Sequence, residues 1–344
     1  MHRCGVATLA SGVERRERSR VGIRPLTIAA VLAVAVILVA GCGREENSAS
    51  TAGTPTAGGT TANLSGRIEV DGSSTVGPFV TAGAEDFQAQ NSGIQVTVGI
   101  SGTGGGFERF CAGETDISDA SRPIKDDEEV PVCQKNGIEY TELQIANDGI
   151  AVVVNNENDW ATCLTVEQLK KIWEPDSKVK SWKDIDASFP DETLTLAGPG
   201  TDSGTFDFFT NEINGEEGAS RTDYQATEDD NVIVQAVEGD KGGLGYFGLS
   251  YFEQNKENLK DVQVDGGSGC VTPSTETVQD GSYTPLSRPL FIYVKNTSLA
   301  KPEVKAFVQY LLDNEEAIAQ NALFVPLTDE EAQKSMSDFE AATS

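Results

Sequence analysis

Short apolar segments alternate with helical patterns along this chain from about Arg67 onward. This alternation is typical of βαβ units, in which helices connect neighbouring strands and cover the sheet. It predicts an α/β fold with mixed, mostly parallel sheets. The predicted strands are 68–70, 95–100, 117–120, 150–155, 193–197 and 291–294, and the predicted helices are 79–90, 106–112, 166–173, 205–213, 231–237 and 304–314.

The chain is also long enough to need two hydrophobic cores, because 344 residues exceed the size at which one core usually suffices. We therefore predict two lobes. The segments 151–155 and 290–295 each lie between blocks that we assign to opposite lobes, and we expect them to form a two-strand hinge. Lobe one then comprises residues 66–148 and 292–344, lobe two comprises residues 149–291, and a cleft separates them.

The N-terminus has the pattern of a bacterial lipoprotein signal peptide. An apolar run from Leu26 to Gly41 follows several arginines and ends at Cys42, and the small residues before this cysteine are typical of a lipidation and cleavage site. The run is shorter than the ~20 apolar residues that cross a bilayer, so a transmembrane anchor is the weaker interpretation. We predict a signal peptide over residues 1–42, lipidation of Cys42, and a flexible tether over residues 43–65. The protein would then be exported and anchored to the outer face of the cytoplasmic membrane.

Without its signal peptide the chain would be strongly acidic and would contain no histidine. Residues 1–42 carry six arginines and two glutamates, so the net charge changes from −28 for the whole chain to −32 without them. Nucleic acids and anionic lipids are poor partners for such a surface. The single histidine, His2, is lost with the signal peptide, which excludes Ser-His-Asp hydrolases, Cys-His proteases and most zinc enzymes. We expect neither a metal nor a cofactor.

Four cysteines other than Cys42 remain in the exported part. Their even number outside the cell indicates two disulfides. Four cysteines allow three pairings, and we favour Cys111–Cys133 with Cys163–Cys270 because the first pair closes a short local loop. A metal site is the weaker interpretation, since the sequence has no CxxC spacing.

Three times, an apolar strand is followed by a loop of glycines and hydroxyl residues and then by the start of a helix. The loops are 71–78, 101–106 and 198–205. A helix start presents unpaired N–H groups and a partial positive charge, glycine lets an anion approach the backbone, and Ser and Thr add hydroxyl donors. One such loop alone is weak evidence, because Ser or Thr before a helix usually caps its own helix. Three of them in an exported two-lobe chain predict an oxyanion site.

A fourth segment, 116–123, ends a short predicted strand with Ser121 and Arg122. In open α/β sheets the carboxyl ends of the strands face the ligand, and the planar guanidinium group of arginine suits phosphate. We therefore add both residues to the candidate site. The alternative for Arg122 is a surface ion pair with one of the many acids.

Together these segments resemble those of the substrate-binding protein of the high-affinity phosphate ABC transporter, which has a type II periplasmic-binding-protein fold. The resemblance extends from about residue 66 to about residue 328 and is densest in 71–78, 101–123, 198–209, 218–231 and 242–252. It implies that hydroxyl and backbone N–H groups hold a phosphate ion between the lobes. The implied ligand residues are Ser74, Thr75, Thr103, Ser203, Gly204 and Thr205.

Two positions depart from the family pattern. Well-known members have an arginine a few residues before the Ser-Gly-Thr motif, where this chain has Pro199, and an aspartate that accepts the phosphate proton, where it has Ser121. We expect Arg122 to supply the principal positive charge instead, with Arg221 as a weaker candidate. The Ser-Arg-Pro sequence at 121–123 suggests a subgroup with this pattern.

The loss of that aspartate leaves the discrimination between phosphate and sulfate to be explained. At neutral pH phosphate usually keeps a proton and sulfate has none. A buried carboxylate aimed at the anion can therefore accept a hydrogen bond from phosphate, and it repels sulfate. The candidate acids beside the predicted loops are Asp71, Asp119 and Asp202.

The sequence therefore predicts a monomeric receptor that binds inorganic phosphate and delivers it to the permease subunits of an ABC importer, without a chemical reaction. The alternative in the same class is a receptor for sulfate, molybdate or arsenate. A phosphohydrolase with Ser203 or Thr75 as nucleophile would need a lysine or carboxylate as its base, because no histidine is left. A sensor or adhesin with the same fold is a third alternative.

Overall fold

The structure is a computed structural model that describes residues 64–344. Its strands are β1 (Gly66–Gly72), β2 (Ile94–Ile100), β3 (Ile117–Ala120), β4 (Tyr140–Asn155), β5 (Cys163–Thr165), β6 (Thr195–Pro199), β7 (Gln225–Thr227), β8 (Gly243–Gly248), β9 (Leu259–Asp261), β10 (Gln263–Asp265), β11 (Cys270–Val271) and β12 (Ser287–Lys295).

The helices are α1 (Gly77–Gln90), α2 (Gly102–Cys111), α3 (Val130–Lys135), α4 (Val166–Trp173), α5 (Trp182–Ile185), α6 (Gly204–Phe209), α7 (Asp230–Glu238), α8 (Leu249–Asn255), α9 (Thr275–Gln279), α10 (Asn296–Leu299), α11 (Pro302–Asp313), α12 (Glu315–Asn321) and α13 (Asp329–Ala342), and a π-helical segment, Thr210–Asn214, follows α6. Among the residues that the structure describes, no helix is long and apolar enough to cross a membrane. The predicted signal peptide, the predicted lipidation site Cys42 and residues 43–63 of the predicted tether lie outside the described residues.

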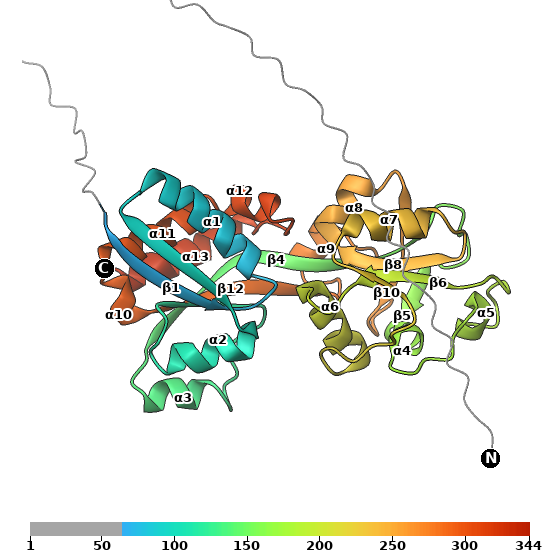
Figure 1. Cartoon of the computed structure of the whole chain (residues 1–344), viewed down its shortest axis with the longest axis horizontal. Helices are drawn as coiled ribbons and strands as arrows, with labels where there is room; N and C mark the ends of the chain where they lie inside the picture. Colours follow the sequence, from blue (N-terminus) through green and yellow to red (C-terminus); the bar gives the residue numbers. More distant parts are fainter. Residues whose placement is uncertain (1–63) are drawn as a thin grey trace, which may run out of the picture. The chain divides into compact units, whose positions relative to one another are not determined.

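A mixed sheet of nine strands organises the described part of the chain. Its order is β2-β1-β3-β12-β4-β8-β6-β7, and β9 also pairs with β4. The pairings toward the two ends of this order are parallel, whereas β12 and β4 run antiparallel to each other and to their outer neighbours β3 and β8. In Figure 1, β4 and β12 run from one group of helices and strands to the other. The predicted mixed α/β class is confirmed.

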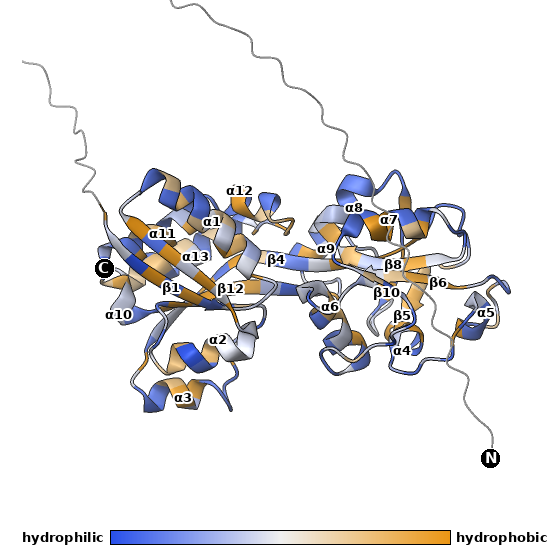
Figure 2. Cartoon of the chain, in the orientation of Figure 1, coloured by the Kyte–Doolittle hydropathy of each residue, from blue (hydrophilic) through white to orange (hydrophobic). Residues whose placement is uncertain are grey.

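Two large hydrophobic cores lie along this sheet, and each defines a lobe. The core of lobe one contains residues of β1, β3, α1 and α11. In α11 the buried residues Val304, Phe307, Val308 and Leu311 recur at helical spacing. The core of lobe two surrounds Trp173 and includes residues of α4, α7 and β8. Figure 2 shows hydrophobic residues along the strands of both lobes and a mixture of hydrophobic and hydrophilic residues on the helices that cover them. Burial of these apolar faces is what holds each lobe together.

The chain passes between the two cores at β4 and at β12. In β4, Ala146 belongs to the core of lobe one and Ile150 to the core of lobe two. Near the start of β12, Leu286 belongs to the core of lobe two and Leu290 to the core of lobe one. The two crossings lie beside each other, because Leu290 is the register partner of Ala146.

Each predicted strand and helix overlaps an observed element, and the main differences have local causes. β4 begins at Tyr140 instead of residue 150, because its first residues are polar and partly exposed and form no apolar run. β8 has no predicted counterpart, since glycine is rare in strands. The glycines serve close packing there, and a Cβ on Gly243 would lie 2.7 Å from the Val237 carbonyl oxygen in α7.

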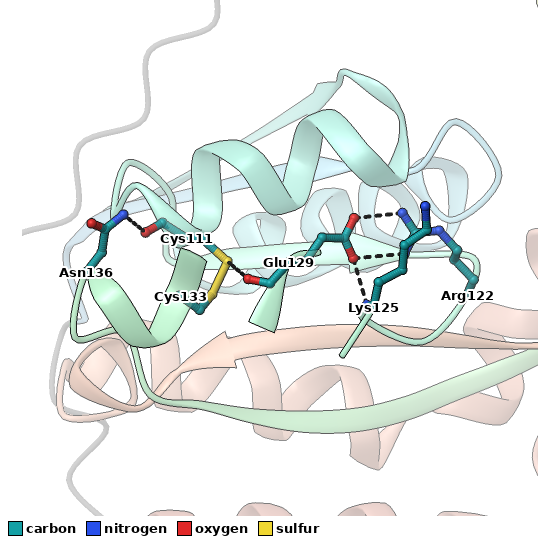
Figure 3. The surroundings of a disulfide bond; sticks show 6 residues. All are labelled: Cys111, Arg122, Lys125, Glu129, Cys133 and Asn136. Atoms are coloured by element: carbon teal, nitrogen blue, oxygen red, sulfur yellow. Dashed lines mark hydrogen bonds and ion pairs between the residues drawn. A yellow bond between two sulfur atoms is a disulfide. The ribbon is translucent and has the colours of Figure 1, made fainter. Parts of the chain in front are cut away.

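Both predicted disulfides are present. Cys111–Cys133 joins the end of α2 to α3 (Figure 3). Both cysteines belong to a small buried cluster that includes Phe107 and Phe110. Cys163–Cys270 joins β5 to β11, the two outer strands of a separate sheet with the order β11-β10-β5. The second bond closes a far longer stretch of chain, with a sequence separation of 107 against 22.

Candidate anion-binding site

The first loop, between β1 and α1, divides its hydroxyl groups between two roles. Ser73 Oγ accepts hydrogen bonds from the backbone N–H groups of Thr75 (3.1 Å) and Val76 (3.4 Å), so Ser73 stabilises the turn itself. Ser74 and Thr75, two of the predicted ligand residues, line a pocket. Because Ser73 satisfies the turn, the neighbouring side chains remain available to a ligand.

The second loop and the segment after β3 are joined by their hydroxyl groups. The hydroxyl oxygens of Thr103 and Ser121 are 3.0 Å apart, and the Ser121 backbone N–H donates to Thr103 Oγ1 at 3.2 Å. Thr103 lies in the first turn of α2, where backbone N–H groups are not yet used by the helix. Both residues line the same pocket as Ser74 and Thr75.

The pocket has a volume of about 690 Å³ and is lined by residues of both lobes. Lobe one contributes the first two loops and the segment after β3. Lobe two contributes α6 and the residues that follow it, and the start of β12 supplies the rest. The lining residues with hydroxyl or charged side chains are Ser73, Ser74, Thr75, Ser101, Thr103, Ser121, Arg122, Lys125, Asp207, Glu212, Glu217, Ser287 and Arg288.

The third loop contacts the first loop but does not line the pocket. Ser203 Oγ accepts a hydrogen bond from the Thr205 backbone N–H at 3.2 Å, so this hydroxyl caps α6. A Cβ on Gly204 would lie 2.3 Å from Thr75 Oγ1 and 2.9 Å from the Thr75 backbone nitrogen. Only glycine permits this contact between the loops. Gly204 therefore lies beside Thr75, and the predicted ligand residues Ser203, Gly204 and Thr205 are all outside the lining of the pocket.

Arg221, the weaker cationic candidate, is not brought to the pocket. Its buried guanidinium group donates from Nη1 to the Ile172 carbonyl oxygen (2.9 Å) and from Nε to Asp223 Oδ1 (2.7 Å). These partners lie within lobe two, and none of them lines the pocket. Arg221 therefore stabilises the lobe and does not contact the candidate site.

Arg122 lines the pocket, but its charge is already paired. Its guanidinium group donates from Nη2 to Glu129 Oε1 (2.7 Å) and from Nη1 to Glu129 Oε2 (2.9 Å), a bidentate pair shown in Figure 3. The guanidinium carbon lies 5.6 Å from the centre of the Phe107 ring. Glu129 immediately precedes α3, which the Cys111–Cys133 disulfide ties to α2. Arg122 therefore forms the ion pair that was the alternative interpretation, and it also lines the pocket as a candidate ligand residue would.

The sequence analysis missed Arg288, at the start of β12, which is the more buried arginine of the pocket. Its side chain is 14% exposed, compared with 34% for Arg122. Arg288 Nη2 donates to Thr75 Oγ1 at 2.8 Å, and Nε donates to Asp148 Oδ2 at 3.2 Å. Its guanidinium carbon lies 3.8 Å from the centre of the Phe208 ring in α6. Burial lowers the pKa of Arg288, and the charge of Asp148 opposes that effect.

A signal for Arg288 was present in the sequence. Ser287-Arg288-Pro289 repeats the tripeptide of residues 121–123, and all six of these residues line the pocket. The repeat is too short to assign a role by itself. Its importance follows from the position of β12, where Arg288 contacts both lobes.

The three acids predicted to accept the phosphate proton do not line the pocket. Asp71 forms an ion pair with Arg109 and accepts a hydrogen bond from the Ser101 backbone N–H at 3.0 Å. Asp119 is buried behind the first loop, which raises its pKa to about 8, and Asp202 is exposed. The acids that do line the pocket are Asp207, Glu212 and Glu217.

The donor set of the pocket suits a tetrahedral oxyanion. Hydroxyl groups, the backbone of loops that precede helices, and a desolvated arginine can together surround such an ion without a metal. Within the described residues, no group of three or more His, Cys, Asp or Glu side chains is placed to hold a metal ion. The site therefore has the features of a binding site for a small anion.

Comparison with known proteins places most of the described region in one family. Residues 47–315 match the PBP superfamily domain. Protein SphX of Synechocystis sp. is 47% identical over 274 residues, which cover 79% of this chain and 81% of that protein. The phosphate-binding protein PstS of Staphylococcus saprophyticus is 44% identical over 264 residues, which cover 76% of this chain and 81% of that protein.

A solved structure agrees with these sequence matches. The crystal structure of a possible phosphate binding protein from Planctomyces limnophilus is 44% identical, covers 82% of this chain and 100% of its own, and superposes with a TM-score of 0.79. The predicted periplasmic-binding-protein fold is thereby confirmed. This chain belongs to the PBP superfamily and, within it, to the family of the SphX and PstS proteins.

Proposed function

We propose that this protein binds inorganic phosphate in the pocket between its lobes and delivers it to the permease subunits of an ABC importer. The observation that carries the proposal is the position of Arg288, a desolvated arginine in contact with Thr75 within a pocket lined by hydroxyl groups. The relatives named phosphate-binding protein support the same ligand. We infer that no bond is broken, because the pocket holds no histidine to act as a base, the Ser203 hydroxyl caps a helix, and the Thr75 hydroxyl oxygen accepts a hydrogen bond from Arg288 instead of lying against a base.

In this proposal the anion accepts hydrogen bonds from both lobes. Ser74, Thr75, Thr103 and Ser121 offer hydroxyl and backbone donors from lobe one. Arg288 compensates the negative charge at the point where the lobes meet. The loop that contains Ser203, Gly204 and Thr205 already contacts Thr75, and a small movement of lobe two would bring its N–H groups to the ligand.

The movement would be a hinge closure at the two crossings, near residues 146–150 and 286–290. We propose the division of the chain into residues 66–148 with 292–344 and residues 149–291 on this basis. A ligand that contacts both lobes favours the closed state by those additional contacts, which is a population shift. The closed form would then be recognised by the permease.

We propose that the protein is exported and that lipid on Cys42 anchors it to the outer face of the cytoplasmic membrane. The sequence pattern of residues 1–42 supports this proposal. The strongly acidic surface makes nucleic acid an unfavourable partner. We further propose that the receptor acts as a monomer.

Replacing Cys42 with alanine is expected to prevent lipidation. The variant should then be unprocessed or released, because the lipid on Cys42 is the membrane anchor in this proposal. Membrane fractionation with detection of the lipid by metabolic labelling provides the measurement. Labelled, membrane-bound protein in the variant would contradict the assignment of Cys42.

Calorimetric titration tests the ligand. We expect the residues 64–344 to bind phosphate at one site and to leave a chromogenic phosphate ester intact during prolonged incubation. Sulfate, molybdate and arsenate should be titrated in parallel, since the same donor set could hold each of them. Binding of sulfate or molybdate without binding of phosphate would identify a receptor for another oxyanion, and release of the chromogenic group would indicate a hydrolase.

A further inference from the structure

The loop between β3 and α3, residues 121–129, places Arg122 in the lining of the pocket and folds around one carboxylate. Glu129 accepts hydrogen bonds from Arg122 Nη2 (2.7 Å) and Nη1 (2.9 Å), and its Oε2 also accepts from the Lys125 backbone N–H at 2.9 Å. The Glu129 side chain is 15% exposed and does not line the pocket itself. The position of Glu129 therefore determines where the guanidinium group of Arg122 lies.

Glu129 is in turn fixed by α3, which begins at the next residue. Its carbonyl oxygen accepts hydrogen bonds from the backbone N–H groups of Val132 (3.0 Å) and Cys133 (3.1 Å) in the first turn of this helix. α3 has six residues, whereas an isolated helix needs roughly 12–15 residues to be even marginally stable in water. The position of α3 must therefore come from its contacts with the rest of lobe one.

Two links join α3 to the end of α2 (Figure 3). Cys133 forms a disulfide with Cys111, the last residue of α2, and Asn136 Nδ2 donates to the Cys111 carbonyl oxygen at 2.8 Å. The buried cluster that contains both cysteines also contains Phe107 of α2, whose ring centre lies 5.6 Å from the Arg122 guanidinium carbon. α2 therefore contacts Arg122 directly through this ring and supports it indirectly through α3.

The opposite end of α2 belongs to the pocket. Thr103, in the first turn, lines the pocket and is hydrogen-bonded to Ser121, the residue before Arg122. One helix thus supports the loop at both ends, at Ser121 through Thr103 and at α3 through Cys111. This arrangement holds Arg122 in place relative to the hydroxyl donors of the second loop. A donor that is already in place costs little conformational entropy when the anion binds.

We propose that the Cys111–Cys133 disulfide positions Arg122 for the anion, acting through α3 and Glu129. The proposal rests on the proposed function and gives this bond a role in ligand affinity in addition to its role in stability. Without the bond, α3 and Glu129 move together with the guanidinium group, so Arg122 must be ordered each time the anion binds. Affinity then falls, because an arginine side chain loses rotamer freedom when it is immobilised.

The test measures phosphate affinity by calorimetric titration for the wild type, Cys111→Ala/Cys133→Ala, Arg122→Ala and the triple variant. Without the disulfide, affinity should fall about 3- to 10-fold, a common size for the coupling between residues of one network. In the Arg122→Ala background, removal of the disulfide should change affinity by less than about 2-fold, because the side chain that the bond positions is absent. A loss caused only by a less stable fold would be equal in both backgrounds.

The other disulfide provides a matched control. Cys163→Ala/Cys270→Ala removes a bond from lobe two, and neither of these cysteines lines the pocket. This control should lower stability and leave phosphate affinity unchanged. Asn136→Ala keeps both disulfides and removes only the hydrogen bond between α3 and α2. It should lower affinity by a smaller factor, again only when Arg122 is present, and it tests the same coupling if the cysteine variant does not fold.

Three results would each overturn the role of the Cys111–Cys133 bond: an unchanged or higher affinity in its absence, an equal loss in the Arg122→Ala background, or an equal loss without Cys163–Cys270. If the cysteine variant does not fold, wild-type affinity in Asn136→Ala would overturn it. In all of these results the wild type still binds phosphate, so the proposed function stands. Failure of the wild type to bind phosphate would instead overturn the proposed function.

Discussion

Replacing Arg288 with alanine is expected to weaken phosphate binding by roughly 2–5 kcal/mol, or about 30-fold to several thousand-fold. Arg288 is the more buried arginine of the pocket, and it donates to Thr75 Oγ1 at 2.8 Å. Without it, a bound dianion would lose a charge-assisted partner in a region with little solvent. Isothermal titration calorimetry at constant ionic strength measures the loss directly.

Two further variants make this result interpretable. Arg122→Ala should have a smaller effect, because Arg122 is more exposed than Arg288. Two hydrogen bonds also hold its guanidinium group to Glu129, whereas Arg288 donates only one hydrogen bond to its acid partner, Asp148. Arg288→Ala also leaves Asp148 buried without its partner, so the double variant Arg288→Ala/Asp148→Asn should be titrated to separate binding from folding. A larger loss for Arg122→Ala than for Arg288→Ala would restore Arg122 as the principal cation, as the sequence led us to expect.

Removing the Cys163–Cys270 disulfide by a double replacement with alanine is expected to lower the free energy of unfolding by about 4–5 kcal/mol. The bond joins residues with a sequence separation of 107, and the entropy that a cross-link removes from the unfolded chain grows with the length of the loop. Neither cysteine is fully buried, so little packing is lost with the sulfur atoms. The effect should therefore come mainly from the unfolded state.

Urea unfolding followed by circular dichroism provides the measurement. The slope of the free energy with urea should also increase, because an unfolded chain without the cross-link exposes more surface. A matched variant removes Cys111–Cys133, whose cysteines have a sequence separation of only 22 and are both buried. Its entropic effect should be smaller, but it also loses packing. A loss below about 1 kcal/mol for Cys163–Cys270 would show that the loop is already restricted in the unfolded chain.

The loops that hold the candidate site were predictable because their signals are local. Glycine, Ser and Thr between an apolar strand and an amphipathic helix indicate a helix start wherever they occur. Such loops predicted where the site lies, the family resemblance then implied Ser74, Thr75 and Thr103, and the end of a predicted strand pointed to Ser121 and Arg122; all five line the pocket. The disulfide pairing could also be predicted, since the short loop between Cys111 and Cys133 favoured one of the three possible pairings.

The charged partners of the pocket depended on contacts between residues far apart in the sequence. Arg288 lies 213 positions from Thr75, and only the insertion of β12 between β3 and β4 brings the two together. Asp207 was hidden for a similar reason, because a helical pattern shows which residues share a face but not which lobe that face will meet. Asp119 shows the opposite error, since its nearness in sequence to Ser121 and Arg122 did not bring it to the pocket.

Periodicity and loop composition are set by residues a few positions apart, so the order of strands, helices and hydroxyl-rich loops could be derived from the chain alone. Which arginine and which acids line the pocket depends on strand order and on the packing of one lobe against the other. Those features are decided by the burial of apolar faces across the whole fold, in which a charged side chain is carried to its position by the strand or helix that bears it.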